Sequence, residues 1–226
     1  MKESSMFNVI DLPRRNTSSR VHTQVAAPGH RLPEAERAVL KLLEDDWRQI
    51  CSGEIVPSHA QLDPHALHNA LPHAFLLHRT APGAVRIRVA GQRLHDLLRM
   101  DPRGMSFGSF FSAAARDTVM DIVDTAFDGP AIVGLPMTAS RGLGRKPMQA
   151  ELLLLPMMDA QGQVTRMMGA LVAAGPLSNR PYRFDIAGDA VLRHDTLNLP
   201  FVERRGIRAR PIPTDKPSLR LVVDNG

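Results

Sequence analysis

Hydrophobic and polar positions follow two different periods along this chain, and each period predicts its own kind of element. In the stretch "AVRIRVA" (84–90), apolar residues alternate with arginines, which is typical of a strand with one buried face. Residues 33–53 instead repeat their apolar positions at helical spacing, so they predict an amphipathic helix. The stripe of this helix is formed by Val39, Leu43, Trp47 and Ile50.

Turn residues divide the remaining apolar stretches into further elements. A helix is predicted over 62–71, where Asp63 can cap it and Pro64 takes its first position. Two more helices are predicted over 92–98 and 112–127. The expected strands are 73–79, 84–90, 131–139, 147–158 and 163–174. Two strands, then helices, then three strands predict an α+β fold with helices packed on one face of an antiparallel sheet.

The composition also suggests how the chain is divided. Residues 1–32 are polar without lasting periodicity and are expected to form a flexible arm. The helix at 33–53 then leads into a domain over 54–176. Residues 177–226 carry scattered arginines and prolines, which predicts a basic, mostly irregular tail with one strand-like piece at 218–223.

Four stretches in this order resemble a PAS domain, and more closely the stand-alone PAS proteins of alphaproteobacteria. They are "DPHALHNALPHAFLLH", "VRIRVAGQRL", "RGMSFGSFF" and "GRKPMQAELLLLPM". The resemblance implies a five-stranded antiparallel sheet in the order 2-1-5-4-3, with a pocket between the sheet and its helices. It also implies a sensory and regulatory role without catalysis.

The stretch "AELLLLPMM" is apolar on both of its faces. Leu152 and Leu154 lie on one face, and Leu153 and Leu155 lie on the other, so we expect both faces to be covered. The inner helices can cover one face, and the stripe of the 33–53 helix is the natural cover for the other. This helix can come from the same chain or from a second subunit. From it we predict a homodimer.

A set of apolar residues is expected to surround the space between sheet and helices. These side chains either line a pocket for a small apolar ligand or simply fill the core, and the sequence does not separate the two. The set is Phe75, Leu77, Val89, Leu94, Phe107, Phe110, Met120, Val123, Leu152, Leu154 and Met168.

The candidate cofactor sites are weak. His65 and His68 lie three residues apart on a predicted helix, but no cysteine accompanies them and Asp63 serves better as a cap, so no metal is predicted. Flavin photosensors of the resembled fold carry a reactive cysteine after the second strand, and "GQRLHDLLRM" has none. The predicted helix at 112–127 contains no histidine for haem, although His95 and Met120 keep a haem sensor as an alternative. We therefore predict no cofactor.

Enzyme chemistry is also not indicated. There is no GxSxG motif, and the single cysteine, Cys51, ends an amphipathic helix. Asp121 and Asp124 take positions typical of a solvent face, and the glycines of "RGLGRK" (141–146) do not open a helix. A small enzyme remains the weaker alternative.

Charge, aromatic content and targeting features indicate the kind of partner and the location of the protein. The net charge is +5 and only 4% of residues are aromatic, so nucleic-acid binding through the basic tail is a second, less favoured reading. With one cysteine, no secretory signal and no spanning apolar run, we expect a cytoplasmic protein. It would lack an output domain of its own and bind an unidentified signalling protein, tuned by a small apolar ligand. Seven arginines either steer an acidic partner or serve only the solubility of the protein, and the sequence leaves both readings open. They are Arg79, Arg86 and Arg88 on the outer sheet and Arg204, Arg205, Arg208 and Arg210 in the tail.

Overall fold

The computed structural model of the chain describes residues 30, 32–51, 56–63, 67–188 and 192–197. Its helices are α1 (Glu34–Ile50), α2 (Gln92–Leu98) and α3 (Ala113–Asp128), with shorter 3-10 turns η1 (His59–Gln61), η2 (His68–His73) and η3 (Phe107–Phe110). Its strands are β1 (Ala74–Ala81), β2 (Ala84–Ala90), β3 (Ala131–Ala139), β4 (Met148–Met158), β5 (Val164–Ala174), β6 (Phe184–Ile186) and β7 (Arg193–Thr196).

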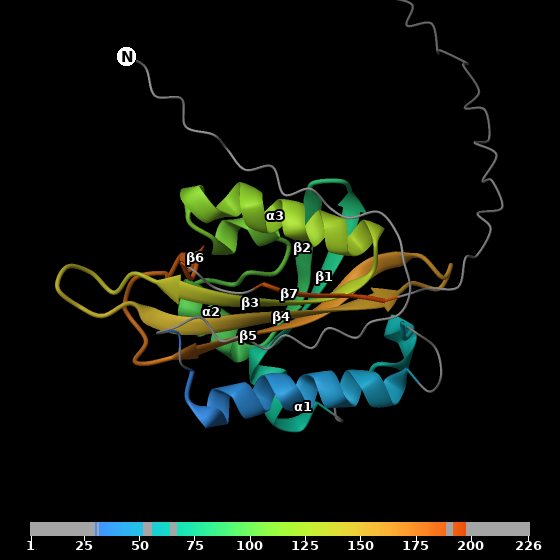
Figure 1. Ribbon diagram of the computed structural model, residues 1–226, viewed down its shortest axis with the longest axis horizontal. Coiled ribbons are helices and arrows are strands. Elements are labelled where there is room, and N and C mark those ends of the chain that lie inside the picture. The colour runs from blue at the N-terminus through green and yellow to red at the C-terminus, as the bar shows by residue number, and fades with distance from the viewer. Residues whose placement is uncertain (1–29, 31, 52–55, 64–66, 189–191, 198–226) are drawn as a thin grey trace, which may run out of the picture.

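The strands form one antiparallel sheet in the order β2-β1-β5-β4-β3-β6, and β7 also pairs with β3. The α+β class and the central order 2-1-5-4-3 are therefore confirmed. Figure 1 shows the sheet between two helical layers, with α3 on one side and α1 on the other. We call these sides the α3 face and the α1 face of the sheet, and each has its own hydrophobic cluster.

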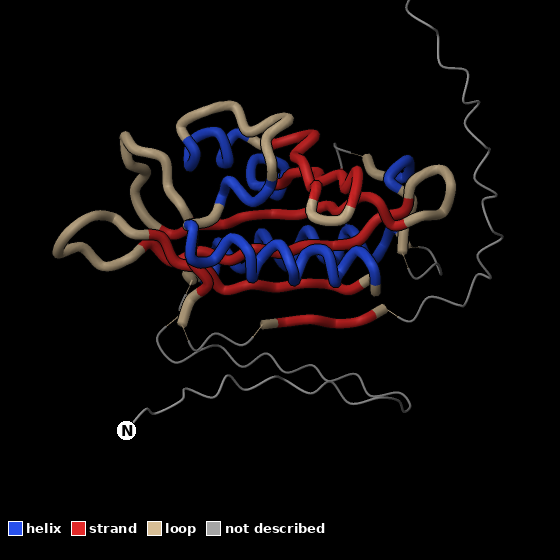
Figure 2. The backbone as a smooth tube through the Cα atoms, turned by 90° about the horizontal axis from the view of Figure 1, so that it is seen from above, coloured by secondary structure: helices blue, strands red, loops and turns tan. Residues whose placement is uncertain are grey.

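The sheet has two short strands that the sequence did not predict. β6 and β7 fall within the tail that was expected to be mostly irregular, and both pair with β3, so that β7 lies at the sheet edge in Figure 2. They span three and four residues, too few for a visible alternation. β6 also contacts the start of α3. Ser112 caps that helix by accepting from the N–H of Ala115 at 3.2 Å, and its hydroxyl donates to Asp185 of β6.

Two residues of the predicted arm lie against the sheet. His30 Nε2 is 3.2 Å from the carbonyl oxygen of Met137 and 3.0 Å from that of Ala150, and Leu32 is buried on the α1 face. The strand-like piece at 218–223 and the tail arginines lie outside the described residues. The predicted helix at 62–71 is wrong in its bounds, because Leu62 and Asp63 are not helical and the 3-10 turn η2 covers His68–His73. Pro64 lies outside the described residues.

α1 is bound to the sheet by its single tryptophan. Trp47 is 1% exposed, and its indole N–H donates to the carbonyl oxygen of Pro156 in β4 at 3.0 Å. Leu40 and Leu43 are buried beside it, whereas Val39 and Ile50 are only half-buried. Leu43 and Trp47 are thus buried as predicted, and the buried stripe also includes Leu40, which the prediction had omitted.

The edge of the sheet is tied to the same helix by charge. Arg193 of β7 holds the carboxylate of Glu44 with two hydrogen bonds of 2.6 and 2.9 Å, and Arg48 donates two more of 3.0 and 2.6 Å. Burial raises the pKa of Glu44, but the hydrogen bonds from Arg193 and Arg48 outweigh it and hold the pKa below its ordinary value. Glu44 therefore stays ionised and fastens α1 to β7.

Replacing Trp47 by Phe removes the indole donor from the buried carbonyl of Pro156. We expect the Trp47→Phe variant to lose about 1–3 kcal/mol of unfolding free energy in urea denaturation. Tyr182→Phe is the matched control, because its hydroxyl donates at 3.1 Å to the carbonyl of Pro176, an exposed residue that water can reach. Equal losses in both variants would contradict this role of Trp47.

Acidification tests the ion pair between Glu44 and Arg193. Because folding lowers the pKa of Glu44 below 4.5, its contribution is complete above that pH and is lost as the pH falls through the lowered value. Glu44→Gln should therefore be less stable at neutral pH, by roughly 1–3 kcal/mol. It should also lose less stability than the wild type between about pH 5 and pH 3. Asp45→Asn, an exposed change on the same helix, should keep the wild-type profile.

Candidate functional site

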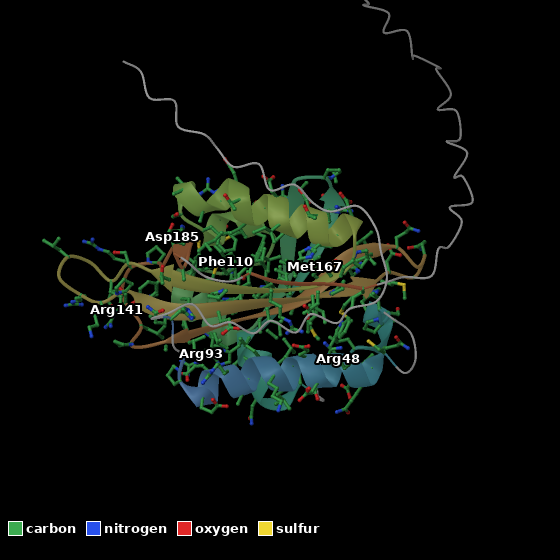
Figure 3. The ribbon with its side chains drawn as sticks, in the orientation of Figure 1. Arg48, Arg93, Phe110, Arg141, Met167 and Asp185 are labelled. Atoms are coloured by element: carbon green, nitrogen blue, oxygen red, sulfur yellow. The ribbon has the colours of Figure 1, made fainter. Side chains whose placement is uncertain are left out.

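Most of the predicted pocket residues come together on the α3 face. Eight of the eleven are buried in one cluster, and Met120 packs against it half-buried. The eight are Phe75, Leu77, Leu94, Phe107, Phe110, Val123, Leu152 and Leu154. Figure 3 places Phe110 between the sheet and α3.

These side chains contact one another as a packed core does. The ring of Phe107 lies 5.6 Å from that of Phe75, 5.7 Å from Phe110 and 5.1 Å from Phe111, measured between centroids. Phe75 also lies directly over Gly169 of β5, where an added Cβ would fall 2.5 Å from its ring. The aromatic rings thus contact one another on the α3 face beside β1.

Two predicted pocket residues lie elsewhere, which corrects the predicted lining. Val89 is 54% exposed, and Met168 belongs to the cluster on the α1 face. The cause is local: the register between β1 and β2 shifts after Leu76, so Leu76 pairs with Val89 but Leu77 pairs with Ile87. Arg88 is the extra residue of this bulge, and it breaks the simple alternation on which the prediction rested.

Val89 and Met168 instead line a groove on the α1 face. The groove has a volume of about 490 Å³. Leu76, Val89 and Met168 lie on its strand side, and Leu67 and Leu71 lie on its η2 side. The full lining is Leu62, Leu67, Leu71, Pro72, Ala74, Phe75, Leu76, Val89, Ala90, Gly91, Gln92 and Met168.

A glycine allows η2 to lie this close to the end of β2. An added Cβ at Gly91 would fall 2.3 Å from the carbonyl oxygen of Leu71 and 2.4 Å from that of Pro72. The N–H of Gly91 also donates to the carbonyl of Ala74 at 2.8 Å. No larger residue fits here without moving η2, so Gly91 sets the distance between the two sides of the groove.

Basic side chains follow the groove residues along β1, β2 and β5. His78 lies two residues after Leu76, pairs with Arg166 of β5, and accepts from Arg88 at Nδ1, with nitrogen–nitrogen distances of 3.1 and 3.3 Å. Burial lowers the pKa of His78, and the charges of Arg166 and Arg88 lower it further. His78 is therefore neutral at pH 7, and the two arginines supply the positive charge.

The predicted interface residues are buried against each other within one chain. Leu43 and Trp47 of α1 lie in the same cluster as Leu153 and Leu155 of β4, with Val39 packed at its margin. In this structure the outer face of β4 packs against the chain's own helix. The homodimer built on this face stays a prediction.

The arginine prediction needs one correction. Arg79 is half-buried on the α3 face, where it pairs with Asp128 at 2.8 Å and lies 4.8 Å from the ring centre of Phe127. Asp124, expected in solvent, accepts from the N–H of Gly83 at 2.7 Å and lies 3.8 Å from Arg79. This pairing joins α3 to the β1–β2 hairpin. Arg86 and Arg88 are exposed, as predicted.

The histidines and the cysteine do not form a joint site in the described part of the chain. No three His, Cys, Asp or Glu side chains there are placed to share a metal ion. His65, and the side chain of His68, lie outside that part. His95 lies 3.9 Å from Asp101, and the thiol of Cys51 lies 3.3 Å from the carbonyl oxygen of Trp47. None of the described helices is long and apolar enough to cross a membrane.

The sequence profile of the PAS domain family matches residues 36–172, which is more than half of the chain. The chain therefore belongs to the PAS domain family. PAS domains are in general sensory and not enzymatic, so this membership indicates a role in sensing a signal. A search of curated proteins found no match.

Solved structures with a related backbone are light-oxygen-voltage (LOV) proteins. The light state of the blue-light photoreceptor Aureochrome1 LOV is 12% identical with a TM-score of 0.35, and the match covers 49% of this chain and 87% of that one. A LOV domain studied with a flavin analogue is 14% identical with a TM-score of 0.35, covering 49% and 83%. An RNA-binding LOV receptor is 18% identical with a TM-score of 0.37, covering 52% and 35%.

Proposed function

We propose that this PAS protein senses a small apolar molecule in the groove on the α1 face and passes the signal on by contact with a partner protein. The supporting observation is the groove itself, a concave apolar site whose volume of about 490 Å³ lies in the range of small-molecule sites. In this proposal the tightly packed α3 face is the structural core, and the regulatory surface is the opposite one.

The groove is placed to influence α1. Leu67 and Met168 line the groove and also belong to the hydrophobic cluster that holds Leu43 and Trp47. A ligand that moves η2 therefore changes the packing beneath α1, because contacts in one close-packed cluster are shared. Such a ligand shifts the protein between two arrangements when it binds one of them more tightly. A partner that contacts α1 then reads the occupancy of the groove.

The proposal includes the predicted location, signalling partner and homodimer of the protein. The protein acts in the cytoplasm as a regulator that binds a signalling partner, and its low cysteine content suits a reducing compartment. The homodimer belongs to the same proposal as one form that the partner contact can take. We place no catalytic step in this site.

The proposal is tested with N-phenyl-1-naphthylamine, an uncharged apolar dye that fluoresces on leaving water. We expect the dye to bind saturably to the wild type. Its affinity for Val89→Asp should be at least about tenfold lower, because a carboxylate in the groove must be desolvated when the dye enters. Val89 is exposed, so this change costs little stability.

Leu143→Asp is the matched control, since Leu143 is also an exposed apolar residue but lies on the loop between β3 and β4. It should bind the dye as the wild type does. Absence of saturable binding to the wild type, or equal binding by Val89→Asp and the wild type, would overturn the proposal.

A further inference from the structure

We infer that the groove selects an amphipathic carboxylate, a free fatty acid of medium chain length, with its chain on the groove lining and its head group at Arg88 and Arg166. This inference rests on the proposed function and adds the chemical class of the ligand. It comes from the position of the two arginines relative to the groove and from what they do and do not contact.

The strand register places both arginines next to the apolar surface. Arg166 lies two residues before Met168 on β5, and His78 lies two residues after Leu76 on β1, where Leu76 pairs with Met168 and His78 pairs with Arg166. Residues two apart on a strand share a face and are about 7 Å apart. The basic pair therefore continues the groove surface formed by Leu76 and Met168.

Arg88 of β2 contacts this basic pair at His78. It is the extra residue of the bulge, and its guanidinium donates to His78, the partner of Arg166 across β1 and β5. Because His78 is neutral, this contact leaves the charge of Arg88 uncompensated. Two cations thus share one small surface next to an apolar groove.

Five arginines of the described residues pair with carboxylates, and Arg88 and Arg166 are among those that do not. Arg79 pairs with Asp128, Arg103 with Asp101, and Arg193 with Glu44. Within the described residues, Arg88 and Arg166 form no ion pair, and Nε of Arg166 is buried without a hydrogen-bond partner. A buried donor left unpaired is costly, so an incoming acceptor gains from satisfying it.

The carboxylate that acts on this cluster from a distance is already occupied. The charge of Asp159 raises the pKa of His78, against the larger lowering by burial and by the two arginines. The Asp159 oxygens accept from the N–H groups of Gln161 and Gln163, both at 2.9 Å, and from the hydroxyl of Thr165 at 2.8 Å. Asp159 is held in the turn between β4 and β5, where it interacts with the charge of Arg166 but forms no ion pair within 4.0 Å with either arginine. An anionic ligand is therefore free to pair with both guanidinium groups directly.

The chemistry of the two parts selects the ligand class. A guanidinium binds a carboxylate through parallel N–H donors, and the lining of the groove has mostly apolar side chains. A volume of about 490 Å³ suits one chain of about ten carbons. A single-chain carboxylate satisfies both ends of the site, whereas a neutral apolar molecule leaves the arginines unsatisfied.

Calorimetric titration compares decanoate with decan-1-ol, which has the same chain without the charge, both below their aggregation limits. We expect the wild type to bind decanoate at least about tenfold more tightly than decan-1-ol. The variants Arg88→Gln and Arg88→Gln/Arg166→Gln should lose this preference and keep the affinity for decan-1-ol. Arg141→Gln, the same charge change on the β3–β4 loop, should bind both ligands as the wild type does.

The outcomes separate this inference from the proposed function. Equal binding of decanoate and decan-1-ol by the wild type, unchanged in the arginine variants, overturns the carboxylate and leaves the apolar groove standing. Binding of neither ligand overturns both. Arg88 is exposed, so its single variant stays informative even if the double variant does not fold. Sedimentation with anionic phosphatidylglycerol vesicles without decanoate binding would assign the cations to a membrane surface and also overturn the inference.

Discussion

The contact between α1 and the strands β4 and β5 is the constraint on which the rest of this structure depends. β4 is apolar on both faces, so the sheet is stable in water only when a second layer covers the face opposite α3. Trp47 provides that cover together with Leu40 and Leu43, and its hydrogen bond to Pro156 fixes where the helix lies. α1 covers β4 and β5, and the groove opens beside it, over the neighbouring strands β1 and β2.

This arrangement divides structural and regulatory roles between the two faces of the sheet. The α3 face is filled by aromatic rings in mutual contact, and Arg79 joins its helix to the first hairpin. The α1 face combines a tightly packed part under Trp47 with a more open part beside η2. A ligand can alter such a site at low cost, because fewer packed contacts have to be broken there than in the core.

Local patterns made the fold predictable, and long-range contacts limited the prediction of the site. The strands 84–90 and 131–139 end where predicted, because their apolar positions and turn residues are local signals. Val89 was assigned to the wrong face since a one-residue bulge is invisible to a period of two. Arg79 was assigned to solvent because its partner Asp128 is 49 residues away. The groove itself depends on the close approach of η2 to Gly91, which no sequence period reports.

Neighbouring methionines on β5 provide the most direct test of the central claim that ligands bind on the α1 face. Met167 is buried in the cluster on the α3 face, and Met168 lines the groove on the other. With methyl-labelled methionine, nuclear Overhauser contacts from the chain of decan-1-ol should reach the methyl group of Met168 and not that of Met167. Contacts to Met167 alone would place the ligand in the α3 core and contradict the account.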